Sequence, residues 1–476
     1  MSPSKIAAEK LERLAQKSPE ELTHSEALIL ARELGPLASW LLKPEVVNKA
    51  RLELVAYGWS TEDVSQYLKP RLPEGPGACW VVAVRKDTTC YPALRDSIVL
   101  PLRWKKGPSE KPPTLPEGLQ QVANEVLSEL KASQSIPESE HWELHPASDD
   151  LFNAAGLLFL KGDYSSAWAP LAGALMVAAG EGKPDHKVWA TGAWDRQAGV
   201  IRVEGIREKL AVAKEFHASQ FFVPASCSDE ARQWILQNNW PIEIKTFEKS
   251  TPRPRDALRR YVSQLHVRAS KSDPPEERAK TYLRIDDDNE RRKYYLDCIL
   301  DDLAAQLRNQ FREEPNKLNC RYFITIVSDS PELIYLMHFV FRPKTSLILY
   351  TLHNENYRKL AIEVEEWLKS PEIQKQLGSP QPRVEAFPDG GLGDLVSRFR
   401  RLMAELLQGD DPHSLVIDVT PGKKTMSIAW ALAAPKGARL AYVDSKFNSD
   451  VRKPVPFEEK LTIFSLDTLP NDSAAS

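Results

Sequence analysis

Hydrophobic and polar positions follow two different periods along the chain. Between residues 4 and 70, apolar side chains recur at helical spacing, as Leu34 and Leu37 do, and this pattern predicts amphipathic helices. From residue 79 onward, short apolar runs such as Trp80–Val84 and Ser97–Leu102 predict strands, which alternate with helices as far as residue 265. We therefore expect a helical N-terminal segment followed by a mixed α/β domain.

From Tyr322 onward the alternation of strands and helices is strict. Strands are expected at 322–327, 346–351, 383–387, 415–419 and 439–443, and helices at 331–340, 355–369, 391–407 and 424–433. Alternation of this kind is typical of a parallel sheet with helices on both faces. The C-terminal part is therefore predicted to be a doubly wound, Rossmann-like α/β domain.

Changes in composition divide the chain into five parts. A Pro/Gly cluster at 73–77 ends the helical pattern, and the polar, Pro-containing stretch around 268–285 is typical of a linker. The resulting parts are a helical N-terminal segment (1–75), the mixed α/β domain (76–267), a linker (268–288), the doubly wound domain (289–469) and a disordered tail (470–476).

Composition excludes several classes of protein. The chain has 476 residues, 42% hydrophobic and 27% charged, with a formal net charge of −3, so broad electrostatic binding to duplex nucleic acid is not expected. No apolar run approaches the roughly 18 residues that span a membrane, and the charged N-terminus does not resemble a signal sequence. Five scattered cysteines without a Cys-x-x-Cys pair indicate a reducing compartment and no metal site. We expect a cytoplasmic protein.

The most informative stretch is residues 415–426. An apolar run ends in Asp418, and a basic turn, Thr420-Pro421-Gly422-Lys423-Lys424-Thr425, leads into a helix that begins near Met426. Free backbone N–H groups and the helix dipole make such a turn an anion site. It lacks the spacing of a Walker A motif.

Ligands of open parallel sheets bind beyond the carboxyl ends of the strands, where the strand order reverses. Two turns follow such ends here, the basic turn and a Ser-rich turn after the first strand, and the second strand adds a side wall. The lysines suit phosphates and the hydroxyls suit ribose or base edges, although a plain helix cap and a solvated lysine pair are the simpler alternatives. The candidate ligand-binding residues are Ser328, Asp329, Ser330, Thr351, Thr420, Gly422, Lys423, Lys424 and Thr425.

Residues 290–470 resemble the CARF domain, the CRISPR-associated Rossmann fold. That family typically carries a Thr-Gly-Gly-Thr-Lys-x-Met turn, and in this chain Pro421 replaces one glycine and Lys423 replaces the second threonine. The resemblance implies a homodimer that binds a cyclic oligoadenylate, the second messenger of type III CRISPR antiviral systems. Thr420, Gly422, Lys423 and Lys424 would then hold phosphates, and Ser328–Ser330 would hold adenosine. A ring of an even number of identical units can lie across a twofold interface.

Residues 78–265 resemble the proteolytic domain of the Lon family, without its AAA+ motor. The resemblance rests on Gly162–Trp168 before an apolar helix, on Ala190-Thr191-Gly192, and on Val203–Leu210. In that family a Pro-Ser-Ala-Gly turn supplies the nucleophile and a Gly-Gly-Leu-Lys-Glu-Lys segment supplies a lysine base. Carried over by position, Ser166 takes the nucleophile place, Thr191 supports the base, and the base position falls on Arg207.

Arginine at that position weakens the expectation of hydrolysis. A serine–lysine pair needs a neutral amine to take the serine proton, whereas a guanidinium stays charged. Lys209 lies two residues further on, and such neighbours do not share a helix face. Two interpretations therefore stay open, a serine peptidase or a domain that keeps the fold without the catalysis.

Three functions follow from these observations. The first, which we favour, is a type III CRISPR effector in which a cyclic oligoadenylate binds the C-terminal domain and regulates the Lon-like domain toward a protein substrate or partner. The second is a ring nuclease that cuts the cyclic oligoadenylate through attack of a ribose 2′-hydroxyl. The third is a ligand-gated binding module without catalysis. None of the three requires a cofactor beyond the activating ligand.

Overall fold

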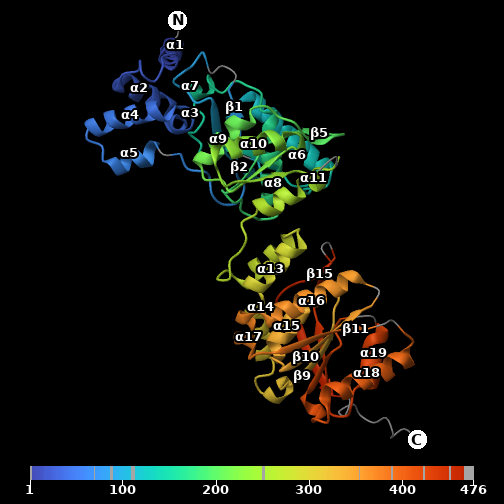
Figure 1. Cartoon of the computed structure of the whole chain (residues 1–476). Helices are drawn as coiled ribbons and strands as arrows, with labels where there is room; N and C mark the ends of the chain where they lie inside the picture. Colours follow the sequence, from blue (N-terminus) through green and yellow to red (C-terminus); the bar gives the residue numbers. More distant parts are fainter. Residues whose placement is uncertain are drawn as a thin grey trace. The chain divides into compact units, whose positions relative to one another are not determined.

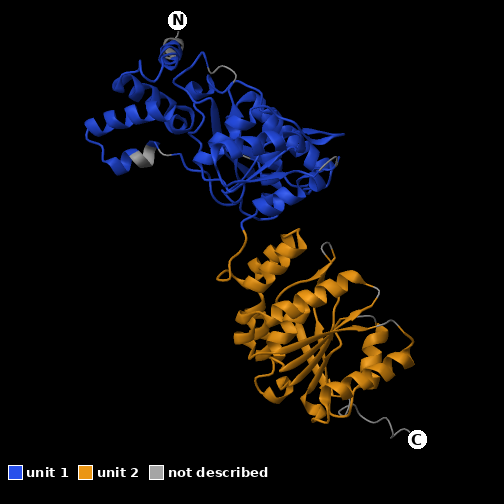
Figure 2. Ribbon diagram, in the orientation of Figure 1, with its two compact units in different colours: residues 1–267 blue, residues 268–476 orange. Residues whose placement is uncertain are grey.

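The computed structural model describes residues 3–68, 70–85, 89–108, 113–248, 252–352, 354–387, 390–421, 424–449 and 452–465. Two of the candidate residues, Gly422 and Lys423, and the tail expected at 470–476 lie outside these ranges. The chain forms two compact units, unit 1 (Met1–Val267) and unit 2 (Arg268–Ser476) (Figure 2). Both are α/β structures, and each is described by itself.

Unit 1 begins with helices, as the apolar spacing predicts. These are α1 (Pro3–Ala15), α2 (His24–Leu34), α3 (Ala38–Leu41), α4 (Pro44–Ala56) and α5 (Thr61–Leu68). Their apolar faces belong to the same core as the α/β part, and the ring of Trp40 stacks on Phe216 with centroids 5.6 Å apart. The helical segment is therefore an integral layer of unit 1.

The remainder of unit 1 contains three small sheets. Strands β1 (Ala78–Val84), β2 (Ser97–Lys106) and β3 (Trp142–Pro146) are antiparallel, β4 (Val188–Ala190), β7 (Gln220–Val223) and β8 (Glu243–Thr246) are parallel, and β5 (Ala193–Asp195) and β6 (Gly199–Ile201) form a hairpin. The helices are α6 (Glu117–Ala132), α7 (Ala154–Leu157), α8 (Trp168–Ala179), α9 (Ile206–Glu215), α10 (Ser228–Asn238) and α11 (Pro254–Leu265). Helix α8 is buried along nearly its whole length, as its continuous apolar sequence requires.

Unit 2 is built on a six-stranded, mostly parallel sheet in the order β11-β10-β9-β12-β13-β16. Its strands are β9 (Tyr322–Ile326), β10 (Thr345–Thr351), β11 (Gln381–Phe387), β12 (Leu415–Asp418), β13 (Arg439–Asp444) and β16 (Lys460–Ser465), of which only β16 runs antiparallel to its neighbour among the described strands. The five parallel strands match their expected positions to within two residues.

Helices cover both faces of this sheet (Figure 1). One core lies against α15 (Glu332–Phe341) and α16 (Glu355–Lys369), and the other against α18 (Leu392–Leu407) and α19 (Lys424–Ala433). Successive residues of β9 point to opposite cores, so that Phe323 belongs to the first and Ile324 to the second. A short helix, α17 (Pro371–Leu377), and a small hairpin, β14 (Phe447–Asn448) with β15 (Lys453–Pro454), complete the unit.

The linker expected at 268–288 is in large part a helix. Helix α12 (Pro275–Arg284) precedes α13 (Asp288–Cys298) and α14 (Leu300–Asn309). Its buried face consists of Arg278, Ala279, Thr281 and Tyr282, and the guanidinium of Arg278 binds the side chain of Asp302 at 2.7 Å. A search for aliphatic periodicity misses a helix that buries polar and aromatic side chains of this kind.

None of the helices within the described ranges combines the length and the apolar character needed to cross a bilayer.

Helix α8 packs against α11 through a glycine, and this contact generates a stability prediction. A Cβ atom added to Gly173 would lie 2.3 Å from Cε1 of Tyr261, a buried ring that also packs on Phe222. Gly173→Ala should therefore lower the free energy of unfolding by about 1–3 kcal/mol in denaturant titrations. Gly162→Ala is the control, because nothing lies within 4 Å of the added atom, and it should stay within about 0.5 kcal/mol.

Candidate functional sites

The serine predicted as nucleophile lies in a short turn that is fixed to the end of β4. Ser166 is half-buried in the 3-10 turn Ser165–Ala167, directly before α8. Its carbonyl oxygen accepts hydrogen bonds from the backbone N–H of Gly192 at 3.0 Å and from the hydroxyl of Thr191 at 3.4 Å. The structure thus brings together the Ser166 and Thr191 segments, which are 25 residues apart in the sequence.

Lys209 completes this arrangement. Its side chain is 2% exposed, and its Nζ atom donates to Oγ1 of Thr191 at 3.1 Å. Helix α9, which carries it, begins after Gly205, whose φ of +69° and contact with Val84 leave no room for a side chain. This start sets the rotation of the helix and turns Lys209 toward Thr191.

Arg207, the residue at the base position by the Lon resemblance, does not share the buried setting of Lys209. The side chain of Arg207 is 58% exposed and lies 3.8 Å from the carboxylate of Glu230. Residues two apart on a helix do point in different directions, as expected. The inward position, however, belongs to the lysine, because the first turn of α9 buries Ile206 and Lys209 and leaves Arg207 in solvent.

The electrostatics of Lys209 suit a base. Burial lowers the pKa of Lys209 to about 8, and the nearby Cys227, Asp163, Glu208 and Glu204 oppose this shift. The neutral amine is therefore accessible at a lower pH than for a solvated lysine. The amine is joined to the serine turn through Thr191, whose hydroxyl group accepts from Nζ of Lys209 and lies 3.4 Å from the carbonyl oxygen of Ser166. A neutral amine is the form of lysine that can accept a hydroxyl proton.

The hairpin β5–β6 packs against the serine turn. A Cβ atom on Gly192 would lie 2.5 Å from Cγ1 of Val200 and 3.2 Å from Cβ of Ala169, so only glycine permits this approach. The ring of Trp168, two residues after Ser166, stacks on Trp194 of β5 with centroids 4.5 Å apart. The segments on both sides of Ser166 are therefore closely packed.

In unit 2 the two predicted turns meet at one edge of the sheet. Strand β9 is the neighbour of β12, while β10 and β13 lie on opposite outer sides of this pair. The strand order therefore reverses between β9 and β12, and the carboxyl ends of both strands face the same edge. The turn after β9 holds Ser328–Ser330, and the turn after β12 begins at Val419.

A buried carboxylate joins the two strands beneath this edge. Asp418 is fully buried and accepts hydrogen bonds from Oγ1 of Thr325 at 2.9 Å and from the backbone N–H of Thr420 at 3.0 Å. The hydroxyl oxygen of Thr420 in turn accepts the N–H of Val443 at 2.8 Å. Burial raises the pKa of Asp418 to about 6. Thr420 is thus tied into the sheet edge and positions the basic turn that follows.

The remaining candidates lie around this edge. Oγ of Ser328 accepts the N–H of Ser330 at 3.4 Å, and Thr351 is half-buried at the end of β10. Lys424 and Thr425 are exposed at the start of α19, the position expected for an anion contact. Among the described residues, no three His, Cys, Asp or Glu side chains gather into a metal site.

Sequence reasoning missed two residues of this edge. The hydroxyl of Tyr357, in the first turn of α16, donates to Oδ1 of Asp329 at 3.0 Å, and Nζ of Lys453, on β15, donates to the carbonyl of Asp329 at 2.7 Å. The place of Tyr357 could have been predicted, because the first turn of a helix that follows a parallel strand lies at the edge of the sheet where ligands bind. Lys453 follows no periodic pattern and offers no such signal.

The buried carboxylate generates a pH prediction for stability. A pKa raised from 3.8 to about 6 means that the folded state binds more protons than the unfolded state between these values, so stability falls as the pH rises through this window. Asp418→Asn removes that dependence. Relative to wild type, its free energy of unfolding should gain up to about 3 kcal/mol between pH 4 and pH 7. Denaturant-dependent hydrogen exchange of peptides covering 415–421 measures this difference.

The control for that experiment is Asp444→Asn, which neutralises an exposed carboxylate at the end of β13. This variant retains Asp418 and should therefore retain the fall in stability between pH 4 and pH 7. An Asp418→Asn curve parallel to that of wild type would contradict the assignment.

No family model matches the sequence, and no match is found among curated proteins.

Proposed function

We propose that this protein is an ancillary effector of type III CRISPR antiviral defence, in which a CARF-like domain within unit 2 binds a cyclic oligoadenylate and thereby controls a Lon-like serine peptidase within unit 1. One observation carries the catalytic half of the proposal, the buried Lys209 whose amine is hydrogen-bonded to Thr191 beside the Ser166 turn. A buried lysine at this place offers the amine that an arginine at the base position cannot supply, and this supports the proposal.

The proposed reaction needs only groups of this chain and a water molecule. Neutral Lys209 takes the proton of the Ser166 hydroxyl while Oγ attacks the substrate carbonyl, and the resulting ammonium gives that proton to the leaving amine. The acyl-enzyme is then hydrolysed by water, with Lys209 as the base a second time. Thr191 keeps the amine oriented through its hydroxyl oxygen.

The ligand half rests on the switch point of the sheet. Exposed Lys424 and Thr425 at the start of α19, together with the Ser-rich turn after β9, supply a cation and hydroxyls at one edge. Adenosine and phosphate groups match this chemistry. A homodimer would let two such edges share one ring, each holding half of it. The ring can regulate catalysis only by binding one of two arrangements of the protein more tightly.

The lysine base predicts a specific pH dependence. Because the neutral amine is the active form, kcat/KM should rise with pH and level off above about pH 8. Lys209→Met and Lys209→Arg should each lower kcat by at least about 100-fold, since neither side chain can take a proton. Arg207→Ala is the matched control and should keep most of the activity, because its side chain is exposed. Loss of activity in Arg207→Ala with retention in Lys209→Met would reverse the assignment.

The whole proposal is tested with the full-length protein, a flexible protein substrate such as β-casein, and cyclic tetra- or hexa-adenylate. We expect calorimetric binding of one ring size, and cleavage that requires both the ring and Ser166. Ser166→Ala should abolish cleavage without changing the affinity for the ring. Ser165→Ala, which changes an exposed neighbouring serine, should retain cleavage. Cleavage that persists in Ser166→Ala would contradict the serine mechanism. If neither ring gave a calorimetric binding signal, the assignment of a cyclic oligoadenylate as the ligand would be wrong.

A further inference from the structure

One segment of unit 2 connects the ligand edge with the helices that begin the unit. We call residues 452–459 the strap, because they lead from the β14–β15 hairpin to β16. At one end, the ammonium of Lys453 donates to the carbonyl oxygen of Asp329 at 2.7 Å, within the Ser-rich turn of the ligand edge. This lysine is the only strap cation bound to that turn among the contacts of the described residues.

The other end of the strap is held by α12 and α14. Phe457 has a φ of +70°, a conformation that is uncommon and costly for a residue with a large side chain. The guanidinium of Arg278, on α12, lies 4.9 Å from the centre of its ring, and Nε2 of Gln306, on α14, donates to its carbonyl at 3.3 Å. Arg278 is 3% exposed and also binds the carbonyl of Cys298 at 2.5 Å. The strained residue is therefore maintained by contacts with these helices.

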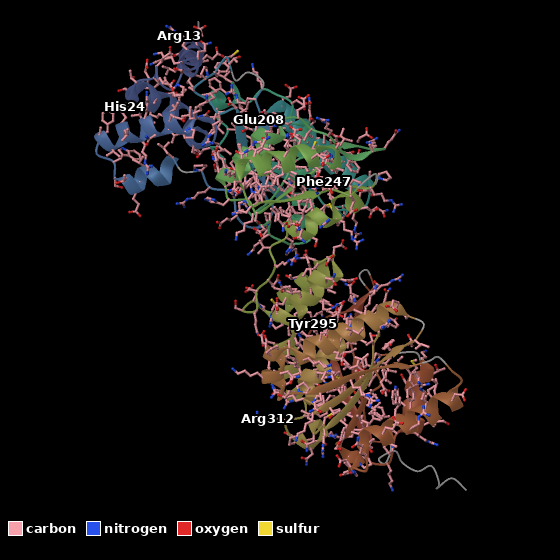
Figure 3. The ribbon with its side chains drawn as sticks, in the orientation of Figure 1. Arg13, His24, Glu208, Phe247, Tyr295 and Arg312 are labelled. Atoms are coloured by element: carbon pink, nitrogen blue, oxygen red, sulfur yellow. The ribbon has the colours of Figure 1, made fainter. Side chains whose placement is uncertain are left out.

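A second route runs from the same edge to α12. Glu332, the first residue of α15, lies two residues after Ser330, is 3% exposed, and interacts electrostatically with Tyr282 of α12. The ring of Tyr282 packs against Tyr295 of α13 with centroids 5.7 Å apart, and Figure 3 marks the place of Tyr295 in unit 2. Glu459, at the end of the strap, is equally buried and lies within electrostatic range of both tyrosines.

This buried cluster holds polar atoms that lack partners. The hydroxyl of Tyr295 and one carboxylate oxygen each of Glu332 and Glu459 form no hydrogen bond with the described residues. Burial raises the pKa of Glu459 to about 7, so its carboxyl can be neutral or charged near physiological pH. A buried network with unpaired members is costly, and small shifts can re-pair it. The cluster is therefore suited to adopt two hydrogen-bonding arrangements.

Helix α12 also fixes the first residues of unit 2. Oγ1 of Thr281 accepts the backbone N–H of Ala269 at 3.1 Å, and the hydroxyl of Tyr294 donates to the carbonyl of Ala269 at 2.8 Å. Ala269 lies two residues beyond Val267, the last residue of unit 1. A displacement of α12 would therefore act on the backbone that joins the two units.

We propose that the strap is the element that reports ligand binding, with Lys453 as a ligand-contacting residue and α12 as its output. Lys453 exchanges the Asp329 carbonyl for a phosphate of the ring, the strap shifts, and Phe457 and Glu459 change their contacts with α12, which alters its hold on Ala269. The proposal rests on the proposed function and specifies how that function is regulated. It requires ligand binding at the edge, but not that unit 1 be a peptidase.

Hydrogen exchange of the full-length protein, with and without cyclic tetra- or hexa-adenylate, tests the strap directly. In wild type, the ring that gives calorimetric heat should change exchange both at the edge (residues 328–332) and in α12 (275–284). Lys453→Ala should weaken ring affinity at least about tenfold, because a charged phosphate contact is lost. Lys460→Ala, which removes an exposed cation just beyond the strap, should change affinity less than about twofold.

Phe457→Ala separates binding from transmission. It should keep ring affinity within about twofold and keep the exchange change at 328–332, but lose the change in 275–284. Phe457→Leu, which keeps an apolar side chain but no aromatic face for Arg278, is the second variant in case the first fails to fold. Thermal unfolding monitors both.

The outcomes separate this proposal from the proposed function. If the ring binds but hydrogen exchange in α12 does not change, the role of the strap is wrong while the ligand assignment stands. The same holds if the exchange change in α12 persists in both Phe457 variants. Unaltered ring affinity in Lys453→Ala would remove the role of that lysine. Absence of heat in wild type with either ring would overturn the ligand and the strap together.

Discussion

The hydrogen bond between the buried amine of Lys209 and the hydroxyl of Thr191 is the interaction on which the interpretation of unit 1 depends. Burial lowers the pKa of this lysine from 10.5 to about 8, so at any pH below 8 the folded state is about 3 kcal/mol less stable than it would be with an unperturbed lysine. This penalty disappears only as the pH rises toward 10.5. The structure accepts this cost to keep a lysine amine hydrogen-bonded to Thr191 at the end of β4, and buried groups with pKa values shifted in this way are typical of functional sites.

Regular periodicity explains which parts of the fold could be predicted from the sequence. The parallel strands of unit 2 are continuous apolar runs between helices with one apolar face, so their positions and their common edge followed from pattern and topology. Helix α12 was mistaken for a linker because its buried face is built from Arg278, Thr281 and Tyr282. Burial of polar groups depends on partners elsewhere in the chain, such as Asp302, and no local pattern reveals it.

The same limit applies to the sites. Residues two apart on a helix lie on different faces, and residues 207 and 209 of α9 do so. This rule does not say which of the two side chains points inward. That choice is made by the start of the helix at Gly205, whose positive φ and contact with Val84 are tertiary features. At the sheet edge, the candidate turns followed from topology, whereas Lys453 arrives from a hairpin whose position the sequence pattern does not specify.

Both units hold ionisable groups that burial drives toward the neutral form, namely Lys209 in unit 1 and Asp418 and Glu459 in unit 2. Asp418 has its hydrogen-bond partners in Thr325 and Thr420, and it therefore stabilises one arrangement of the sheet edge. One carboxylate oxygen of Glu459, by contrast, has no hydrogen-bond partner among the described residues, and this carboxyl lies within electrostatic range of Tyr282 and Tyr295. A satisfied network resists rearrangement, whereas an unsatisfied one can improve its hydrogen bonding by moving. The sheet edge around Asp418 is thus held in place, whereas the cluster that includes Tyr282 of α12 is a part of unit 2 that can gain hydrogen bonds from a shift.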